Sequence, residues 1–146
     1  MTSTDPTGLR PVERREFDGL VLAWSPDTRI LHVTTAGTIT ITTGNAGLQS
    51  VEAINAWVGG STEPFGYLCD NSGIEDSDAA ARAAWAECFD AHRKFIRAAW
   101  YGQSPHMQVM LRMFITGLRA KGPFIGNACL DEDEARTWLR GQKIDA

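Results

Sequence analysis

The stretch YLCDNSGIEDSDAAAR, residues 67–82, joins two different sequence patterns. It begins inside the apolar run FGYLCD at 65–70, which is typical of a short buried strand. It ends in an alanine-rich segment that opens an amphipathic helix. An acidic segment holding Ser72 and Ser77 separates the two. A buried strand that leads into a helix is the unit from which parallel sheets are built, so this stretch predicts an α/β fold.

The residues upstream of this stretch carry strand patterns. GLVLAW at 19–24 and RILHVTTA at 29–36 flank the turn sequence SPDT, in which Pro26 suits the second position of a type I turn. TITITT at 38–43 alternates strictly between isoleucine and threonine, as in a half-buried strand. These segments predict an antiparallel start to the sheet.

The residues downstream alternate between helical and strand patterns. Gly59 and Gly60 end a first helix, and Ser104 with Pro105 forms a good start for the third. We expect helices near 45–58, 79–97, 105–120 and 131–141, and strands at 65–70, 98–102 and 124–130. The expected order is three strands, followed by helices and strands in alternation. This order predicts a mixed, largely parallel sheet with an antiparallel N-terminal hairpin and four helices.

The composition is that of an ordinary globular protein. The chain has 146 residues, of which 43% are hydrophobic and 22% charged, a size that suits one domain. We expect residues 1–15 to form a disordered or loosely docked tail and residues 16–146 a single domain.

The net charge of -4 argues against nucleic acid as a partner. The start of the chain lacks the apolar segment of a signal peptide, and no apolar run is long enough for a membrane span, so we expect a cytoplasmic protein.

The cysteines predict reduced core residues. Cys69, Cys88 and Cys129 are scattered and form no CxxC pair. Cys88 and His92 are four residues apart on the expected second helix, a spacing that could form a metal pair or a thiolate–imidazole dyad. Both also fall on the apolar stripe of that helix, which favours core packing. We therefore expect no metal and no cofactor, and we expect DEDE at 131–134 to complement a helix dipole.

The acidic segment between strand and helix has two interpretations. Ser77 stands directly before the alanine-rich helix, where its hydroxyl could cap the free backbone amides, and Asp78 would complement the helix dipole. Alternatively, Ser72 or Ser77 could accept a phosphate. The local acidic residues oppose that charge and no arginine of the segment stands ready to pair with it, so we favour the cap.

The element order and several sequence words resemble the SpoIIAA-like branch of the STAS superfamily, also described as STAS/SEC14-like. The resemblance covers roughly residues 17–141. It rests on the strand that ends in Asp70, the SDAAAR helix opening, SP before a helix rich in Met and Phe, and the final DEDEARTWL. It implies a sheet covered by helices and a role in regulation or protein interaction.

The resemblance also singles out a switch segment. Anti-sigma-factor antagonists of this superfamily carry a D-S-[ST]-G word after the central strand, and a partner kinase phosphorylates its first serine. The word here is Asp70, Asn71, Ser72 and Gly73, so the acceptor position holds asparagine. Together with Ser77, the first three of these residues form the candidate switch segment.

The third expected helix, PHMQVMLRMFITGL, is apolar on more than one face. One stripe suits packing against the sheet and consists of Met107, Met110, Leu111, Phe114 and Leu118. Val109 and Met113 fall outside it, next to Arg112. The terminal helix could cover them, or they could form a contact between subunits. We predict a homodimer with this helix at the interface.

These patterns predict a non-enzymatic regulatory or protein-interaction domain. The sequence has no Gly-rich phosphate loop, GxSxG or HExxH word on which to build an enzyme hypothesis. The alternative is a module that binds a small molecule or lipid in an apolar pocket under the helices. The residues expected to line such a pocket include Trp57, Trp85, Phe114 and Trp138.

Overall fold

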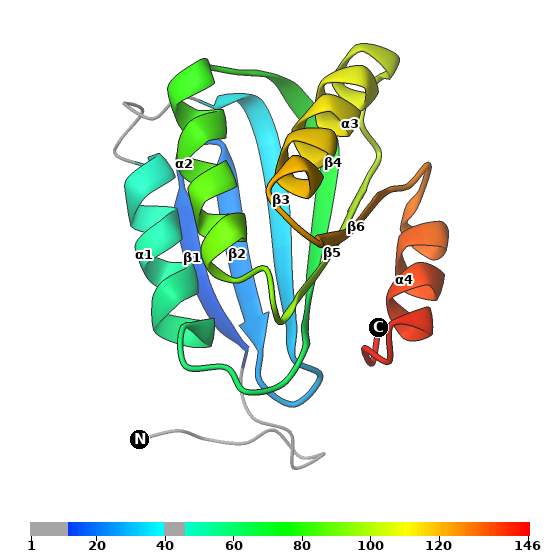
Figure 1. Ribbon diagram of the computed structural model, residues 1–146. Coiled ribbons are helices and arrows are strands. Elements are labelled where there is room, and N and C mark those ends of the chain that lie inside the picture. Colours follow the sequence, from blue (N-terminus) through cyan, green and yellow to red (C-terminus); the bar gives the residue numbers. More distant parts are fainter. Residues whose placement is uncertain (1–11, 40–45) are drawn as a thin grey trace.

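A computed structural model describes residues 12–39 and 46–146 of the chain. Strands and helices alternate after an initial group of strands (Figure 1). The strands are β1 (Glu13–Phe17), β2 (Leu20–Ser25), β3 (Ile30–Ile39), β4 (Phe65–Ser77), β5 (Ile96–Tyr101) and β6 (Ile125–Ala128). The helices are α1 (Ala46–Val58), α2 (Ala79–Ala91), α3 (Pro105–Ala120) and α4 (Glu132–Gly141).

The strands form one mixed sheet in the order β1-β2-β3-β4-β5-β6. β1, β2 and β3 pair antiparallel, and the pairs from β3 to β6 are parallel. The predicted α/β class, with an antiparallel start, a parallel remainder and four helices, is confirmed. No helix in the described part of the chain is long and apolar enough to cross a membrane.

The sheet has a helical layer on each face. α1, α2 and α3 cover one face, and α4 lies against the other (Figure 1). Tyr67 and Cys69 of β4 point into the larger core under α1–α3, whereas Leu68 points into the smaller core under α4. This alternation follows from the two-residue period of a strand whose two faces are both covered.

The N-terminal strands differ from the expectation. β1 (Glu13–Phe17) was not predicted and begins inside the stretch assigned to the tail. Within the segment expected as a third strand, 38–43, Thr38 and Ile39 form the end of β3, and residues 40–45 lie outside the described residues. β1 consists of four consecutive charged residues followed by Phe17, so its sequence lacks the alternation that signals a strand.

The middle of the chain differs in two boundaries. β4 does not stop at Asp70 but continues through the acidic segment to Ser77, paired with β3. α2 ends at Ala91, and a turn leads into β5 at Ile96, whereas the helix was expected to reach residue 97. The turn contains no Gly or Pro, so the sequence lacks the usual signal for a helix end.

Candidate functional site

A cavity of about 120 Å³ lies between α2, α3 and the sheet. Its walls come from α2, from the amino-terminal half of α3, from β4, and from residues near the carboxyl-terminal ends of β3 and β5, with Leu20 of β2. Ligands of open α/β sheets usually bind at these strand ends. Trp85 and Phe114 line the cavity as expected, but Trp57 and Trp138 do not, and Trp138 packs on the opposite face of the sheet.

An aromatic cluster forms the floor of this cavity. The ring of Phe89 lies 4.9 Å from that of Tyr67, 5.5 Å from that of Trp100 and 5.7 Å from that of Phe114, measured between centroids. These pairs meet edge to face, the arrangement that aromatic quadrupoles favour. The cavity is therefore bounded by rigid apolar side chains.

A bulge in β4 shapes the polar edge of the cavity. Thr34 pairs with Asp70 and Ala36 pairs with Gly73, so Thr35 alone faces two residues of β4. The buried side chain of Asn71 lines the cavity, and its Oδ1 atom accepts hydrogen bonds from the Thr35 hydroxyl (2.7 Å) and the Cys69 thiol (3.2 Å). Bulges commonly re-aim side chains next to functional sites.

Asp70 and Ser72 lie together at this bulge. The Asp70 Oδ1 atom accepts hydrogen bonds from the backbone amide (2.9 Å) and the hydroxyl (2.6 Å) of Ser72. Ser72 also lies close to Gly102, where φ is +83° and where an added Cβ would come within 3.1 Å of the Ser72 Cβ and 3.2 Å of its backbone nitrogen. Asp70 therefore fixes the exposed Ser72 by local hydrogen bonds. Three of the four predicted switch residues, Asp70, Asn71 and Ser72, are adjacent in the structure.

Ser77, the fourth predicted switch residue, is not the cap of α2, and that expectation was wrong. Asp78 is the N-cap, because its carboxylate accepts a hydrogen bond of 2.7 Å from the Ala81 amide. Ser77 is the last residue of β4, and its hydroxyl and carbonyl accept hydrogen bonds from Arg82 Nη1. The acidic segment itself contains no arginine, as expected, but Arg82 of α2 reaches back to this serine. Arg82 lies one turn into the helix, so a reading of the acidic segment alone does not find it.

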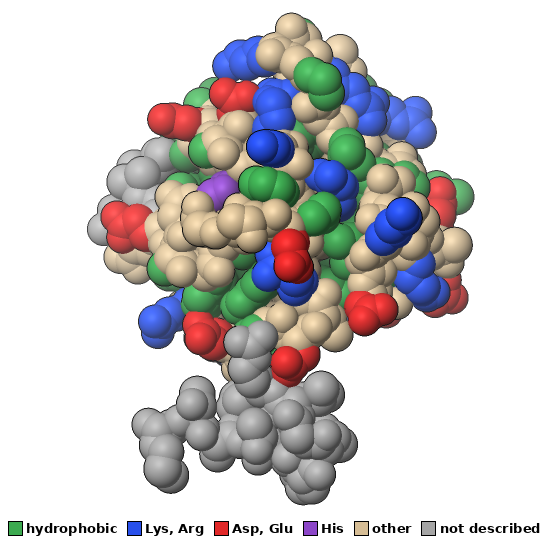
Figure 2. All heavy atoms as spheres, turned by 60° about the horizontal axis from the view of Figure 1, so that its bottom comes forward, with side chains coloured by type: hydrophobic (Ala, Val, Ile, Leu, Met, Phe, Trp, Pro, Cys, Tyr) green, Lys and Arg blue, Asp and Glu red, His purple; other side chains and the backbone are tan. Residues whose placement is uncertain are grey.

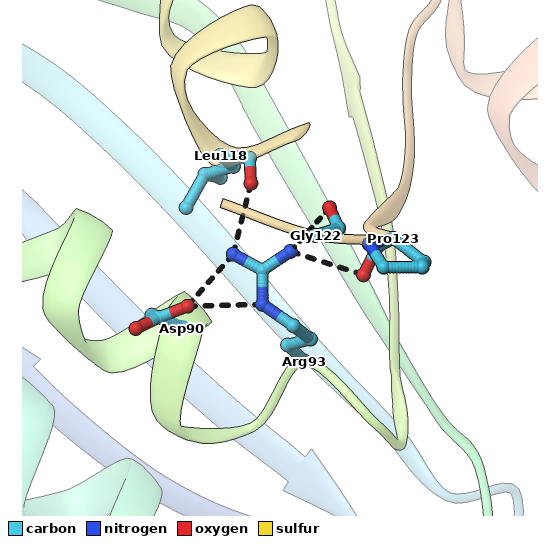
Figure 3. Close-up of polar contacts among 5 residues, drawn as sticks. All are labelled: Asp90, Arg93, Leu118, Gly122 and Pro123. Atoms are coloured by element: carbon cyan, nitrogen blue, oxygen red, sulfur yellow. Dashed lines mark hydrogen bonds and ion pairs between the residues drawn. The ribbon is translucent and has the colours of Figure 1, made fainter. Parts of the chain in front are cut away.

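Arg93 holds α2 and α3 together at their carboxyl-terminal ends (Figure 3). Its guanidinium donates hydrogen bonds to the Asp90 carboxylate and to the carbonyl oxygens of Leu118, Gly122 and Pro123, at 2.7–3.0 Å. The cavity lies between the opposite ends of the same two helices. The sequence carries no local signal for this contact, because the partners of Arg93 include backbone carbonyls distant in the chain.

Basic side chains gather at the end of the molecule where α2 and α3 terminate. Figure 2 brings this end forward and shows Lys and Arg side chains interspersed with hydrophobic ones. Arg119 lies in the last turn of α3, Lys121 is its C-cap, and Arg93 and Lys94 follow directly after the end of α2. Cations are favoured at the negative end of the helix dipole, which accounts for this distribution.

The outer face of α3 is a candidate interaction surface. Val109 and Met113 are 59% and 69% exposed, and they are four residues apart, so they share one side of the helix next to the exposed Arg112. The alternative that α4 covers them is wrong, because α4 packs on the other face of the sheet. The inner stripe of α3 is as expected, with Met107 and Leu118 buried against the core.

The thiols and His92 occupy the core or its edge. Cys69, Cys88 and Cys129 are free and buried. Burial raises the pKa of the Cys88 thiol to about 12 and that of Cys129, which also lies near Glu134 and Asp131, to about 11. His92 caps the end of α2 rather than lying on its stripe, and its Nε2 atom is 2.7 Å from Asn55 Oδ1. Burial lowers the pKa of His92, which favours the neutral ring.

The acidic residues at 131–134 begin α4, as expected. The Asp131 carboxylate accepts a hydrogen bond of 2.9 Å from the Glu134 amide, and the Glu134 carboxylate accepts one of 2.8 Å from the Leu130 amide. This reciprocal arrangement satisfies free amides at the helix start. Among residues 12–39 and 46–146, no three His, Cys, Asp or Glu side chains are placed to hold a metal ion.

Solved structures share this architecture. An uncharacterized protein of the DUF3478 family from Shewanella loihica PV-4, described as having a SpoIIAA-like fold, matches with a TM-score of 0.59 and 16% identity over 88% of this chain and 92% of that one. The anti-sigma factor antagonist SpoIIAA, in its unphosphorylated form, matches with a TM-score of 0.51 and 14% identity over 90% and 99% of the two chains.

An anti-sigma factor antagonist from Mycobacterium paratuberculosis matches with a TM-score of 0.51 and 19% identity over 94% of this chain and 99% of that one. No protein-family model and no curated protein matches the sequence. The chain therefore has a SpoIIAA-like fold, and the resemblance noted in its sequence is confirmed at the level of the fold.

Proposed function

We propose that this protein is a non-enzymatic regulatory domain of the STAS, SpoIIAA-like type that acts through protein–protein contact. The observation that carries the proposal is the outer face of α3, where Val109 and Met113 are exposed beside Arg112. Large exposed apolar side chains that share one helix face are a common feature of interaction sites, and Met and Arg are enriched in interfaces. Two of the similar structures are named as antagonists of anti-sigma factors, which are themselves proteins.

The buried thiols and the local contacts of the polar residues support a role without catalysis. A thiol must lose its proton to act as a nucleophile, and the raised pKa values of Cys88 and Cys129 oppose this. The Asp70 carboxylate is engaged by Ser72. The thiols contribute to the buried core, and Asp70 orders the bulge through its hydrogen bonds with Ser72.

The contact that we propose for α3 is a homodimer with two-fold symmetry, the commonest form of small oligomer. A two-fold axis near Met113 would place the same apolar and Arg side chains of both copies against each other. Among the candidate switch residues, Asp70, Asn71 and Ser72 lie at the bulge of β4 and Ser77 lies just before α2. A partner or a modification could act on the exposed Ser72 or on Ser77.

Site-specific photocrosslinking tests this surface. A benzophenone amino acid at position 113 should crosslink to a second copy of the chain, whereas the same probe at Leu130, which is also highly exposed, should not. Because both probes sit on exposed positions, the comparison separates a specific contact from random collision. Equal crosslinking at the two positions would contradict the proposal.

A second function is favoured by the cavity between α2 and α3. A concave apolar site with a few polar groups is the usual form of a small-molecule site. The cavity of about 120 Å³ has aromatic walls and polar side chains that include Asn71 and Arg82. We propose that the protein is alternatively, or in addition, a binding module for a small apolar ligand.

A further inference from the structure

The polar group of greatest interest at the cavity is the guanidinium of Arg82. Its Nη1 atom donates hydrogen bonds to the carbonyl and hydroxyl of Ser77, while its Nε and Nη2 atoms bond to no residue of the described chain. Arg82 also forms no ion pair with a carboxylate among residues 12–39 and 46–146. A charged donor with N–H groups that no described residue accepts from therefore stands at the wall of an apolar cavity.

The position of Arg82 favours an anion. It lies in the first turns of α2, whose dipole adds positive potential at the same end of the helix. The planar guanidinium binds a carboxylate through parallel N–H···O bonds, which is the geometry that Nε and Nη2 present together. Ser77 restrains the side chain through Nη1, so fewer rotamers are lost when a ligand binds.

The cavity limits the size and chemistry of the rest of the ligand. Its volume of about 120 Å³ is close to the ~150 Å³ of a cavity that holds benzene. Trp85, Trp100 and Phe114 line it, and such side chains favour another aromatic ring through edge and face contacts. A cavity of this volume therefore suits a single ring and is too small to hold a long acyl chain.

We propose that this cavity binds a small carboxylic acid with one aromatic ring, whose ring lies among Trp85, Trp100 and Phe114 and whose carboxylate pairs with Arg82. This inference rests on the second function proposed above and names its ligand class. The aromatic walls set the size of the ligand, and Arg82 sets the charge.

Calorimetric titration of the full-length protein with 3-phenylpropionate and with neutral 3-phenylpropanamide tests the proposal. The two probes have the same ring and nearly the same shape, and they differ in charge. The carboxylate should bind at least about tenfold more tightly than the amide, because hydrogen bonds to charged groups are the stronger ones. Trp85 and Trp100 line the cavity, so tryptophan fluorescence should report the same binding.

Two variants locate the site. Arg82→Gln should weaken binding of the carboxylate by about 10- to 100-fold and leave binding of the amide unchanged. Arg15→Gln, which removes an equal charge from the exposed strand β1, should alter neither. Met110→Trp enlarges a side chain in the cavity wall and should abolish binding of both probes. Cooperative thermal unfolding of each variant establishes that it is folded.

The outcomes separate this inference from the function on which it rests. If the carboxylate and the amide bind equally and Arg82→Gln changes neither, the cavity is a ligand site but the proposed anionic class is wrong. If neither probe binds at millimolar concentration, both the ligand class and the binding-module function are overturned. Binding that survives Met110→Trp in a folded variant places the site elsewhere and also contradicts the proposal.

Discussion

The guanidinium of Arg93, just after the end of α2, donates a hydrogen bond of 2.9 Å to the carbonyl oxygen of Leu118 in the last turns of α3. The same side chain binds the carbonyl oxygens of Gly122 and Pro123 after that helix. It therefore satisfies carbonyl groups that a helix end leaves free, and it places a positive charge at the negative end of the α3 dipole. The two helices are joined here and enclose the cavity at their other ends.

Replacing Arg93 with Ala should lower the free energy of unfolding by about 2 kcal/mol, because it leaves several partly buried acceptors without a donor. The Arg93 side chain is only 17% exposed, so water does not readily replace it. Urea denaturation measures the loss. Arg15→Ala on the exposed strand β1 is the control, expected to lie within about 0.5 kcal/mol of the wild type. An Arg93→Ala variant as stable as this control would show that the contact does not hold α3 in place.

The start of α2 offers a second test. Asp78→Ala removes the N-cap and should cost about 1 kcal/mol of stability, whereas Asp78→Ser, which keeps a capping oxygen, should recover most of it. Ser77→Ala removes only the hydroxyl contact with Arg82 and should cost less than Asp78→Ala. Thermal and urea unfolding of the three variants rank their losses of stability. A larger cost for Ser77→Ala would restore Ser77 as the main stabilising residue of this helix start.

The sequence predicts the fold well where local patterns and the tertiary structure agree. The start of α3 at Ser104 and Pro105 has both a capping residue and a proline, and the structure places the N-cap at Ser104. The apolar run at 65–70 forms the centre of β4 as expected. In these places each residue favours the structure that it adopts, so single-sequence patterns suffice.

The sequence does not predict the features that depend on distant partners. Acidic residues are disfavoured in strands, so Glu75 and Asp76 gave no sign that β4 continues; their segment is a strand because it pairs with the end of β3. The cavity depends on how far α2 and α3 separate, which no local pattern encodes. Trp85 and Trp138 both look like pocket residues in the sequence, yet they lie on opposite faces of the sheet.

The buried thiols predict a characteristic dependence of stability on pH. The pKa of Cys88 is raised to about 12 and that of Cys129 to about 11, against an ordinary value of 9.0 for both. The unfolded chain loses these protons first, so the stabilisation is complete below pH 9 and is lost as the pH rises toward 11. Denaturation between pH 8 and 10.5 should show this loss, and Cys88→Ala should reduce its slope. A slope unchanged in Cys88→Ala would exclude Cys88 as a source.

Thiol labelling and elemental analysis test the same residues independently. An aromatic disulfide reagent should label the native protein slowly at pH 8 and should label all of Cys69, Cys88 and Cys129 after unfolding, because burial limits access to each thiol. The purified protein should contain no stoichiometric zinc. Rapid labelling of Cys88 in the native state, or one zinc ion per chain, would contradict the assignment of these cysteines to the core.

Sedimentation of the wild type and of Met113→Glu tests the proposed interaction surface most directly. At about 50 micromolar, well above the Kd of a specific dimer, the molar mass of the wild type from sedimentation should be twice the 16.0 kDa of the chain. Met113→Glu should sediment as a monomer, because like charges would meet across the two-fold axis, while Leu130→Glu, a charge at another exposed apolar position, should remain dimeric. A monomeric wild type would contradict the dimer, and a dimer that persists in Met113→Glu would contradict the placement of its interface on α3.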